Sequence, residues 1–195
     1  IIRKKQIKLF NENDKINLLY IDDLCKIILD EINHNKKNNN LIKIDKKFIT
    51  TTTPKSILEK LLLFQKNRHS KFIPEFNDVL TKNLYSTFLT FLPKSKFVYP
   101  IKKITDRRGE FVEFIKSNNF GQVSFIKVNS KSTRGNHYHM SKVEKFLLLN
   151  GKCKFEFKNM KNKLEKINFI IDSNKSEIVE TIPGWLHSLK NLSNY

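Results

Sequence analysis

The hydrophobic pattern changes its period at Pro93, and this change constrains the fold more than any other feature of the sequence. Before Pro93, apolar residues recur every three or four positions, which is the spacing of one face of an α-helix. After Pro93, apolar and polar residues alternate in short runs bounded by turn residues, as in half-buried β-strands. The sequence therefore predicts an α+β chain with a mostly helical region and an all-β region, joined around residues 93–100.

Helix starts are the clearest signals in the first region. Thr53 can accept the N-cap hydrogen bond of a helix whose first position is Pro54. Asp22-Asp23 can cap an earlier helix, and a third helix is expected over residues 77–91. The apolar face of the first helix comprises Leu24, Ile27, Ile28 and Ile32. Strands are expected at residues 18–21 and 41–44, with a polar loop at residues 34–40.

The second region contains six short segments with strand patterns. Asn150-Gly151 lies between two of them and is typical of a type I′ hairpin turn. Six or more short strands within about 90 residues indicate a small barrel or sandwich. The expected strands are residues 111–115, 123–128, 145–149, 152–157, 167–171 and 177–182.

The net charge of +18 first suggests a nucleic-acid partner. Only five of the 37 basic residues are arginines, however, and the 32 lysines are spread along the whole chain. Surfaces that read bases and phosphates favour arginine, whose planar fork binds bidentately. No apolar run approaches the roughly 20 residues needed to cross a bilayer. We therefore expect neither a nucleic-acid partner nor membrane insertion.

The two cysteines, Cys25 and Cys153, each lie among apolar neighbours. Both are expected to be buried free thiols, as is typical of a cytoplasmic protein. The chain has no CxxC pair, so a zinc site built from cysteines is excluded.

Metal-binding residue types gather after residue 136. His137 and His139 are two apart, so on a strand both side chains would point to the same face. Glu144 follows five residues later, and the segment 183–187 adds His187 after a Pro-Gly pair. A single histidine in a strand is usually structural, so the combination carries the prediction. Three imidazoles and a carboxylate can enclose a divalent cation and leave positions open for a substrate.

These residues resemble the two signature motifs of the cupin superfamily. The matching positions are His137, His139, Glu144, Gly151, Pro183, His187 and Asn191. Cupins normally place a glycine six residues before the first histidine, and here that position is Lys131. The resemblance implies a jelly-roll barrel with a divalent metal, zinc. The implied ligands are His137, His139, Glu144 and His187.

A narrower resemblance covers nearly the whole chain. The stretches 106–114, 121–124 and 144–146 look like those of bifunctional bacterial enzymes of capsular-polysaccharide and O-antigen synthesis, which reduce UDP-2-acetamido-2,6-dideoxy-hexos-4-uloses. It implies that residues 1–95 are the C-terminal portion of a short-chain dehydrogenase/reductase domain, and Leu19–Asp23 is similar to an element of that domain. Residues 96–195 would be a cupin domain without its last strands.

That resemblance also implies a function. The cupin would invert C3 of a UDP-4-keto-6-deoxy-HexNAc substrate, and the reductase domain would then reduce C4 with NADPH. The chain has no Gly-rich phosphate-binding loop, so NADPH binding is expected only upstream of Ile1, and reductase activity is not expected here. A homodimer is implied as well. Two alternatives remain: another metal cupin, such as an isomerase or dioxygenase, and a non-catalytic sugar-binding cupin.

Substrate contacts are suggested by a further likeness. The stretch from Asp106 to Glu113 resembles one in dTDP-sugar epimerases where an arginine contacts nucleotide phosphate, which makes Arg108 and Glu113 substrate-binding candidates. Arg108 could equally form an ion pair with Asp106 or Glu110. Trp185 could line the pocket or pack the end of the barrel.

The catalytic base is not identified by spacing. Lys145 and Tyr138 lie near the motifs, and each could equally be structural. Tyr138 alternates with the two histidines of the motif, so it should point away from the metal.

Overall fold

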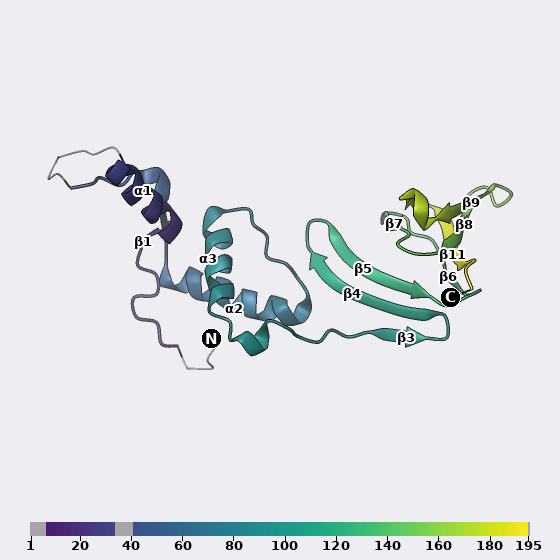
Figure 1. Ribbon diagram of the computed structural model, residues 1–195, viewed down its shortest axis with the longest axis horizontal. Coiled ribbons are helices and arrows are strands. Elements are labelled where there is room, and N and C mark those ends of the chain that lie inside the picture. The colour runs from purple at the N-terminus through teal and green to yellow at the C-terminus, as the bar shows by residue number, and fades with distance from the viewer. Residues whose placement is uncertain (1–6, 34–40, 195) are drawn as a thin grey trace. The chain divides into compact units, whose positions relative to one another are not determined.

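The computed structural model describes residues 7–33 and 41–194, and it divides into two compact units (Figure 1). The helical unit comprises residues 1–100 with 115–122, and the β unit comprises residues 101–114 and 123–195. The loop expected at residues 34–40 lies outside the described residues. Among the described helices, none combines the length and apolar character needed to cross a bilayer. That the helical unit is part of a reductase domain stays a prediction.

The helical unit pairs two short strands and packs two helices together. Its elements are β1 (Ile16–Leu19), α1 (Ile21–Asn33), a 3-10 helix (Lys46–Phe48), β2 (Ile49–Thr52), α2 (Pro54–Ser70), α3 (Val79–Thr90) and a 3-10 helix (Lys94–Lys96). Strands β1 and β2 are antiparallel, with Leu18 opposite Thr50. Phe64 of α2 packs against Phe88 of α3, with ring centroids 5.8 Å apart, and both side chains are buried.

Two of the expected helix starts are confirmed. The Thr53 hydroxyl accepts a hydrogen bond from the Ser56 N–H at 3.2 Å, and α2 begins at the next residue, Pro54. The Asp78 carboxylate accepts one from the Thr81 N–H at 2.7 Å, at the start of α3. Both side chains satisfy N–H groups that the first turn of a helix leaves without a partner.

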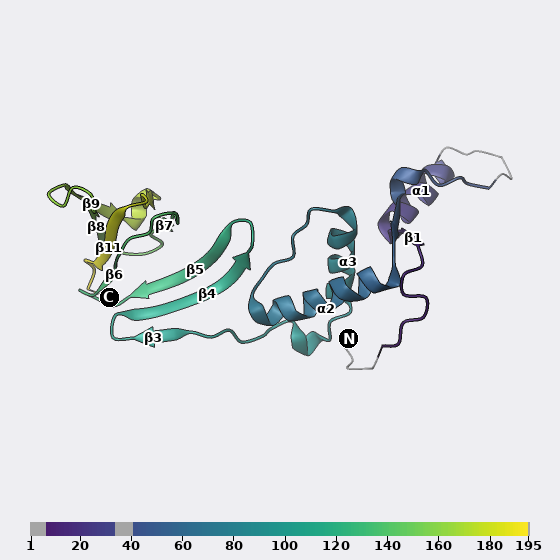
Figure 2. The same cartoon turned by 180° about the vertical axis from the view of Figure 1, so that it is seen from behind.

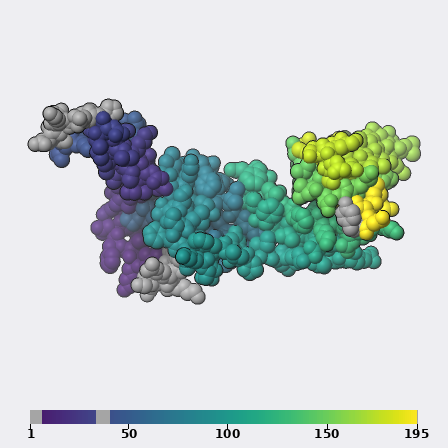
Figure 3. Space-filling model, in the orientation of Figure 1, coloured from purple at the N-terminus to yellow at the C-terminus, as the bar shows by residue number. Residues whose placement is uncertain are grey.

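Other expectations for this unit are wrong. Residues 41–44 form no strand, and the partner of β1 is β2, five residues later. Helix α1 begins at Ile21, so Asp22 and Asp23 lie in its first turn. There their negative charges interact favourably with the positive end of the helix dipole. None of its residues is buried, and Cys25, Ile28 and Ile32 are exposed. Figure 3 shows α1 as a protruding dark-blue segment.

The β unit contains most of the strands, and Figure 2 shows them from behind. They are β3 (Ile104–Asp106), β4 (Gly109–Ser117), β5 (Gly121–Val128), β6 (Thr133–His137), β7 (Lys145–Leu147), β8 (Lys152–Asn159), β9 (Lys166–Asp172), β10 (Ile178–Glu180) and β11 (Trp185–Asn191), with a 3-10 helix at Ser173–Lys175. The sheet orders are β3-β4-β5, β10-β7 and β6-β11-β8-β9. The six expected strands are confirmed, β6 ends at the first histidine of the strand expected to carry His137 and His139, and β3 and β11 were not expected. The chain is therefore of mixed α+β class.

The core of the β unit lies between the last two sheets. Its buried members are Cys153, Phe155, Phe157, Ile171 and Val179. Phe146, Leu148, Trp185 and Leu189 pack against them, so side chains from both sheets meet in one cluster. Alternate residues of β8 face inward, which is the period of two that the sequence shows there.

The hairpin expected at Asn150-Gly151 is wrong. Strand β7 pairs with β10, whereas β8 pairs with β9 and β11, so the chain passes from one sheet to another at this point. Of the two turn residues, only Gly151 has a positive φ, of 89°, whereas a type I′ turn needs two. The same residue pair therefore serves a connection between sheets.

A β-bulge in β6 changes which side chains face the core. His137 lies opposite His187, and Arg134 lies opposite Leu189, so Asn136 is an extra residue between them. Because directly opposed residues share a face, Arg134 and His137 both point to the side of Leu189. Gly135 makes the bulge possible: its φ is +87°, and a Cβ there would lie 2.8 Å from the His187 carbonyl oxygen.

Candidate metal centre

Four side chains from separate segments converge in the β unit. His137 is the last residue of β6, and His139 lies two residues beyond it. Glu144 directly precedes β7, and His187 lies in β11 opposite His137. Residues as far apart as 137 and 187 therefore meet because β6 and β11 are neighbours in one sheet.

The donor atoms are spaced as ligands of one small cation would be. Oε2 of Glu144 lies 3.0 Å from Nε2 of His187, 3.7 Å from Nε2 of His139 and 3.8 Å from Nε2 of His137. One donor atom from each of His137, His139 and Glu144 lies within 4.8 Å of the others, and His187 adjoins this group of three through Glu144. Ligands about 2.0–2.1 Å from a tetrahedral zinc ion would be roughly 3.3 Å from one another. The observed distances bracket that value.

Unsatisfied polar atoms support the same conclusion. Oε2 of Glu144 and Nε2 of both His139 and His187 are buried and make no aligned hydrogen bond within the described parts of the chain. A buried polar atom without a partner costs about 1–3 kcal/mol, and native proteins seldom tolerate several together. A carboxylate and neutral imidazoles are donors that suit zinc and related cations. The group fits a divalent cation.

His139 lies in a loop beyond β6, so its position does not follow from the alternation of side chains along a strand. Strand β6 ends at His137, so the two histidines do not lie on one strand as expected. Instead, the Gly184 N–H donates a hydrogen bond of 2.8 Å to the His139 carbonyl oxygen. The turn before His187 thereby holds the loop that carries His139, and Gly184 adopts the positive φ, of 80°, that this turn needs.

The electrostatics favour the metal-binding forms of two of these side chains. Burial, with repulsion from His137, lowers the pKa of His187, so its imidazole stays neutral, as a ligand must be. Burial alone would raise the pKa of Glu144, but the hydrogen bond and charge of the Lys142 ammonium are the largest causes that lower it overall, so the side chain is a carboxylate. Only 3% of the His187 side chain is exposed, and its ring lies against Phe146 and Phe157.

The other candidate residues are arranged differently. Tyr138 is 45% exposed, just past the end of β6. Lys145 lies in β7 with its ammonium 3.3 Å from the Glu180 carboxylate. Trp185 packs against the buried cluster, and Glu113 is half-buried in β4. The catalytic and substrate-binding roles expected of these four residues stay predictions.

A cavity of about 420 Å³ adjoins the core of the β unit. Phe146 and Phe155 line it, and the Phe146 ring also contacts His187. Lys145 lines the cavity as well. Asn191, the last residue of the cupin-like motif, is at its edge and donates a hydrogen bond of 2.8 Å to the Val128 carbonyl oxygen. Asn191 thus joins β11 to the end of β5 and has a structural role.

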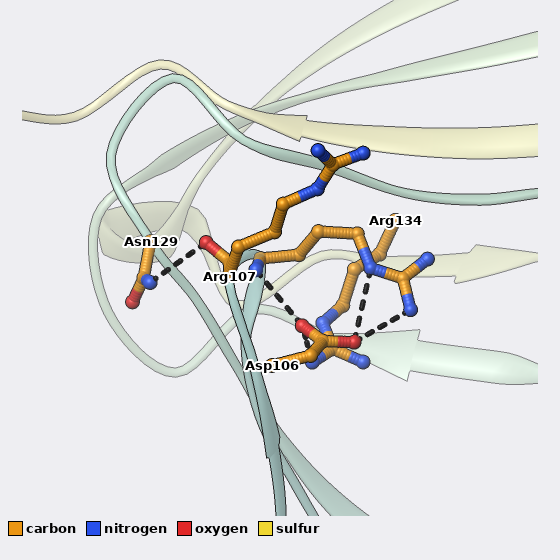
Figure 4. A network of polar contacts seen from close by, with 5 residues as sticks. Asp106, Arg107, Asn129 and Arg134 are labelled. Carbon is orange, nitrogen blue, oxygen red and sulfur yellow. Dashed lines mark hydrogen bonds and ion pairs between the residues drawn. The ribbon is translucent and has the colours of Figure 1, made fainter.

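A network of polar contacts surrounds Asp106, the last residue of β3 (Figure 4). The Asp106 carboxylate accepts hydrogen bonds from Arg108 Nε at 3.1 Å and Nη2 at 2.6 Å, and from Arg134 Nη2 at 3.1 Å. The Arg108 contacts are the main cause of the lowered pKa of Asp106. The Arg107 side chain points away from that carboxylate. Of the two ion pairs considered for Arg108, the one with Asp106 is therefore formed.

Sequence reasoning missed three residues near the candidate centre. Arg134 is only 13% exposed, and its buried Nε has no hydrogen-bond partner within the described segments. Its place on the same face as His137 depends on the bulge, which no periodicity reveals. Lys142 and Thr181 both contact Glu144. Lys142 is two residues from Glu144, but the sequence shows nothing that separates it from the other lysines.

Known proteins are similar to this chain over nearly its whole length. A family model described as the polysaccharide biosynthesis C-terminal domain matches residues 104–195. A curated UDP-2-acetamido-2,6-beta-L-arabino-hexul-4-ose reductase from Pseudomonas aeruginosa is 36% identical over 194 residues, which is 98% of this chain and 51% of the relative. This chain thus spans about half the length of that relative.

Two solved structures are similar to the chain at 31% sequence identity. The capsular polysaccharide assembling protein CapF from Staphylococcus aureus has a TM-score of 0.86, with 99% of this chain and 52% of CapF covered. A structure of CapF with the inhibitor 3-isopropenyl-tropolone has a TM-score of 0.89, with 99% and 55% covered. The likeness includes both the helical unit and the β unit.

Proposed function

We propose that this chain modifies a sugar nucleotide in capsular polysaccharide synthesis. The proposal rests on the match of residues 104–195 to the polysaccharide biosynthesis C-terminal domain and on the homology of the whole chain to CapF and to a UDP-sugar reductase. The proposed substrate is a UDP-4-keto-6-deoxy-HexNAc, and the proposed reaction of the β unit, as a cupin, is inversion at C3. NADPH-dependent reduction at C4 is proposed for the longer protein, with no contribution from this chain alone.

The convergence of His137, His139, Glu144 and His187 is the observation that carries the proposal. These side chains would hold the cation, and zinc suits the donor set. A bound divalent cation acts as a Lewis acid that stabilises the charge developing on a ketone oxygen, which makes the neighbouring C–H acidic. His187 and Glu144 contribute buried, preoriented donors, so little reorganisation accompanies binding.

The substrate diphosphate is proposed to bind the arginines. Arg108 and Arg134 share a single carboxylate, that of Asp106, so the group is net positive. Arg134 shares the face of His137, and their partners Leu189 and His187 are two residues apart on β11, which is about 7 Å along a strand. A guanidinium suits phosphate oxygens because it donates two parallel hydrogen bonds. This geometry would place the sugar ring toward the cation.

Lys145 and Tyr138 remain the proposed candidates for the base that removes the C3 proton. The cavity favours Lys145, which lines it and lies one residue from Glu144.

The proposed homodimer is tested by sedimentation, in which a mass of one chain would contradict it.

Deuterium exchange tests the proposed reaction. The zinc-loaded chain is incubated with the 4-keto UDP-sugar in deuterated water, and deuterium at C3 is measured by mass spectrometry. We expect incorporation with the wild type and none with Glu144→Gln. The matched control is Glu156→Gln, because Glu156 is also paired with a lysine two residues away but lies apart from the histidines. Absence of exchange with the wild type, or exchange that survives Glu144→Gln, would reject the proposal.

The tropolone inhibitor of CapF offers a second test. A tropolone presents a carbonyl and a hydroxyl oxygen side by side, a pair that chelates divalent cations. If the four side chains hold a cation, 3-isopropenyl-tropolone should bind the zinc-loaded chain and bind the His137→Ala variant far more weakly. Equal binding to both proteins in a calorimetric titration would mean that the inhibitor binds away from the candidate centre.

A further inference from the structure

The backbone of Glu144 is fixed on both sides by one residue. The Glu144 N–H donates to the Thr181 hydroxyl at 2.8 Å, and the Thr181 N–H donates to the Glu144 carbonyl oxygen at 2.8 Å. Thr181 is only 2% exposed, and the two residues extend the ladder between β7 and β10, in which Lys145 lies opposite Glu180. The point from which the Glu144 side chain starts is therefore rigid.

The two carboxylate oxygens of Glu144 have different surroundings. Oε1 lies 2.7 Å from the Lys142 ammonium, which donates a hydrogen bond to it. Oε2 is buried, has no hydrogen-bond partner within the described residues, and faces the imidazoles of His187, His139 and His137. Lys142 is 51% exposed, so its ammonium approaches the carboxylate from the solvent side.

This asymmetry matters because a carboxylate can bind a cation through one oxygen or through both. An ammonium held at one oxygen competes with the cation for the lone pairs of that oxygen. We propose that Lys142 is a positioning residue: it occupies Oε1 of Glu144 so that the side chain offers a divalent cation Oε2 alone. The inference rests on the proposed function only in requiring that the four side chains bind a cation.

The consequence is a defined coordination number. Three imidazoles and one carboxylate oxygen give four protein donors, whereas a carboxylate bound through both oxygens gives five. Hydrogen-bonding partners of metal ligands typically change metal affinity 10–100-fold when they are removed. Loss of the Lys142 ammonium should therefore alter both the affinity and the geometry of the bound cation.

Cobalt(II) titration tests this inference, because the visible absorption of cobalt weakens as its coordination number rises. We expect Lys142→Met to change the cobalt affinity 10–100-fold, with a weaker visible band per bound ion. Lys142→Arg keeps a cationic donor and should recover most of the affinity and band intensity. Lys154→Met is the matched control, since Lys154 also lies 2.7 Å from a glutamate two residues away and should leave both readouts unchanged.

The outcomes separate the inference from the proposed function. If the wild type binds no cobalt, the metal-binding proposal fails, and this inference fails with it. If the wild type binds cobalt and Lys142→Met has the same affinity and spectrum, only the positioning role is rejected. A change in affinity or band intensity that Lys142→Arg does not reverse, or that Lys154→Met shares, would also overturn it.

Discussion

The helical unit and the β unit treat buried polar groups in opposite ways. In the helical unit, buried Thr81 accepts a hydrogen bond from Lys60 and donates one to Asp78, so its hydroxyl is satisfied. In the β unit lie all the buried side-chain nitrogen and oxygen atoms without partners that the described residues contain. They belong to Arg134, His139, Glu144 and His187.

This difference indicates which unit is built for binding. Leaving a buried polar atom unpaired destabilises a fold by about 1–3 kcal/mol, and several such atoms at one point are explained if a ligand satisfies them. The helical unit has no comparable group among its described residues, and its conspicuous feature is instead the exposed apolar side chains of α1, such as Ile28 and Ile32.

Truncation of one core phenylalanine in each unit should give the largest effects. Phe64 is 1% exposed in the helical unit, and Phe157 is 6% exposed in the β unit. Each change to alanine should cost about 3–5 kcal/mol of unfolding free energy, measured by urea denaturation. Only Phe157→Ala should also weaken zinc binding, because its ring contacts His187. An equal loss of zinc affinity in Phe64→Ala would break the distinction between the units.

Two glycines with the same φ give a sharper and smaller comparison. Gly135 in the β unit and Gly121, in the part of β5 that groups with the helical unit, both have φ of +87°. An added Cβ would meet nothing within 4 Å at Gly121 but would lie 2.8 Å from the His187 carbonyl oxygen at Gly135. Gly121→Ala should cost about 1–2 kcal/mol from the left-handed backbone alone. Gly135→Ala should cost more and also lower zinc affinity; equal effects in urea denaturation would contradict the close approach.

The two thiols give the smallest expected effect. Burial raises the pKa of Cys153 to about 11, from an ordinary 9.0, whereas Cys25 is exposed on α1. At pH 8, iodoacetamide should modify Cys25 and spare Cys153 in the folded protein, as mass spectrometry would show. Because the unfolded chain releases the Cys153 proton first, this thiol should lower the unfolding free energy as the pH rises from 9 to about 11. Fast modification of both thiols would contradict this burial.

The sequence predicted the residue types of the candidate centre better than it predicted which strands and loops contact one another. The four candidate ligands came from residue type, spacing and the likeness to the cupin motifs, and the structure places Glu144 within 4 Å of each of the three histidines. That they bind a metal stays a prediction. The reason given for His137 and His139 was wrong, since His139 is held by the Gly184 N–H and not by a shared strand. Local periodicity contains no information on such contacts between distant segments.

Burial and turn chemistry show the same limit. The helical spacing of Ile28 and Ile32 predicted α1 correctly, but spacing does not say what covers a face, and both side chains are exposed. Asn150-Gly151 is a good local hairpin signal, yet β8 pairs with β9 and β11 instead of β7. At Lys131, where cupins have glycine, the backbone keeps a left-handed φ of 59° despite the side chain.

Zinc stoichiometry and affinity test the central claim most directly. The purified chain is titrated with zinc in competition with a chromophoric chelator, beside the His187→Ala variant, whose imidazole is the most buried of the four candidate ligands. The account predicts one tightly bound zinc ion per chain in the wild type and a large loss of affinity in the variant. No tight zinc binding by the wild type, or equal affinity in the two proteins, would contradict it.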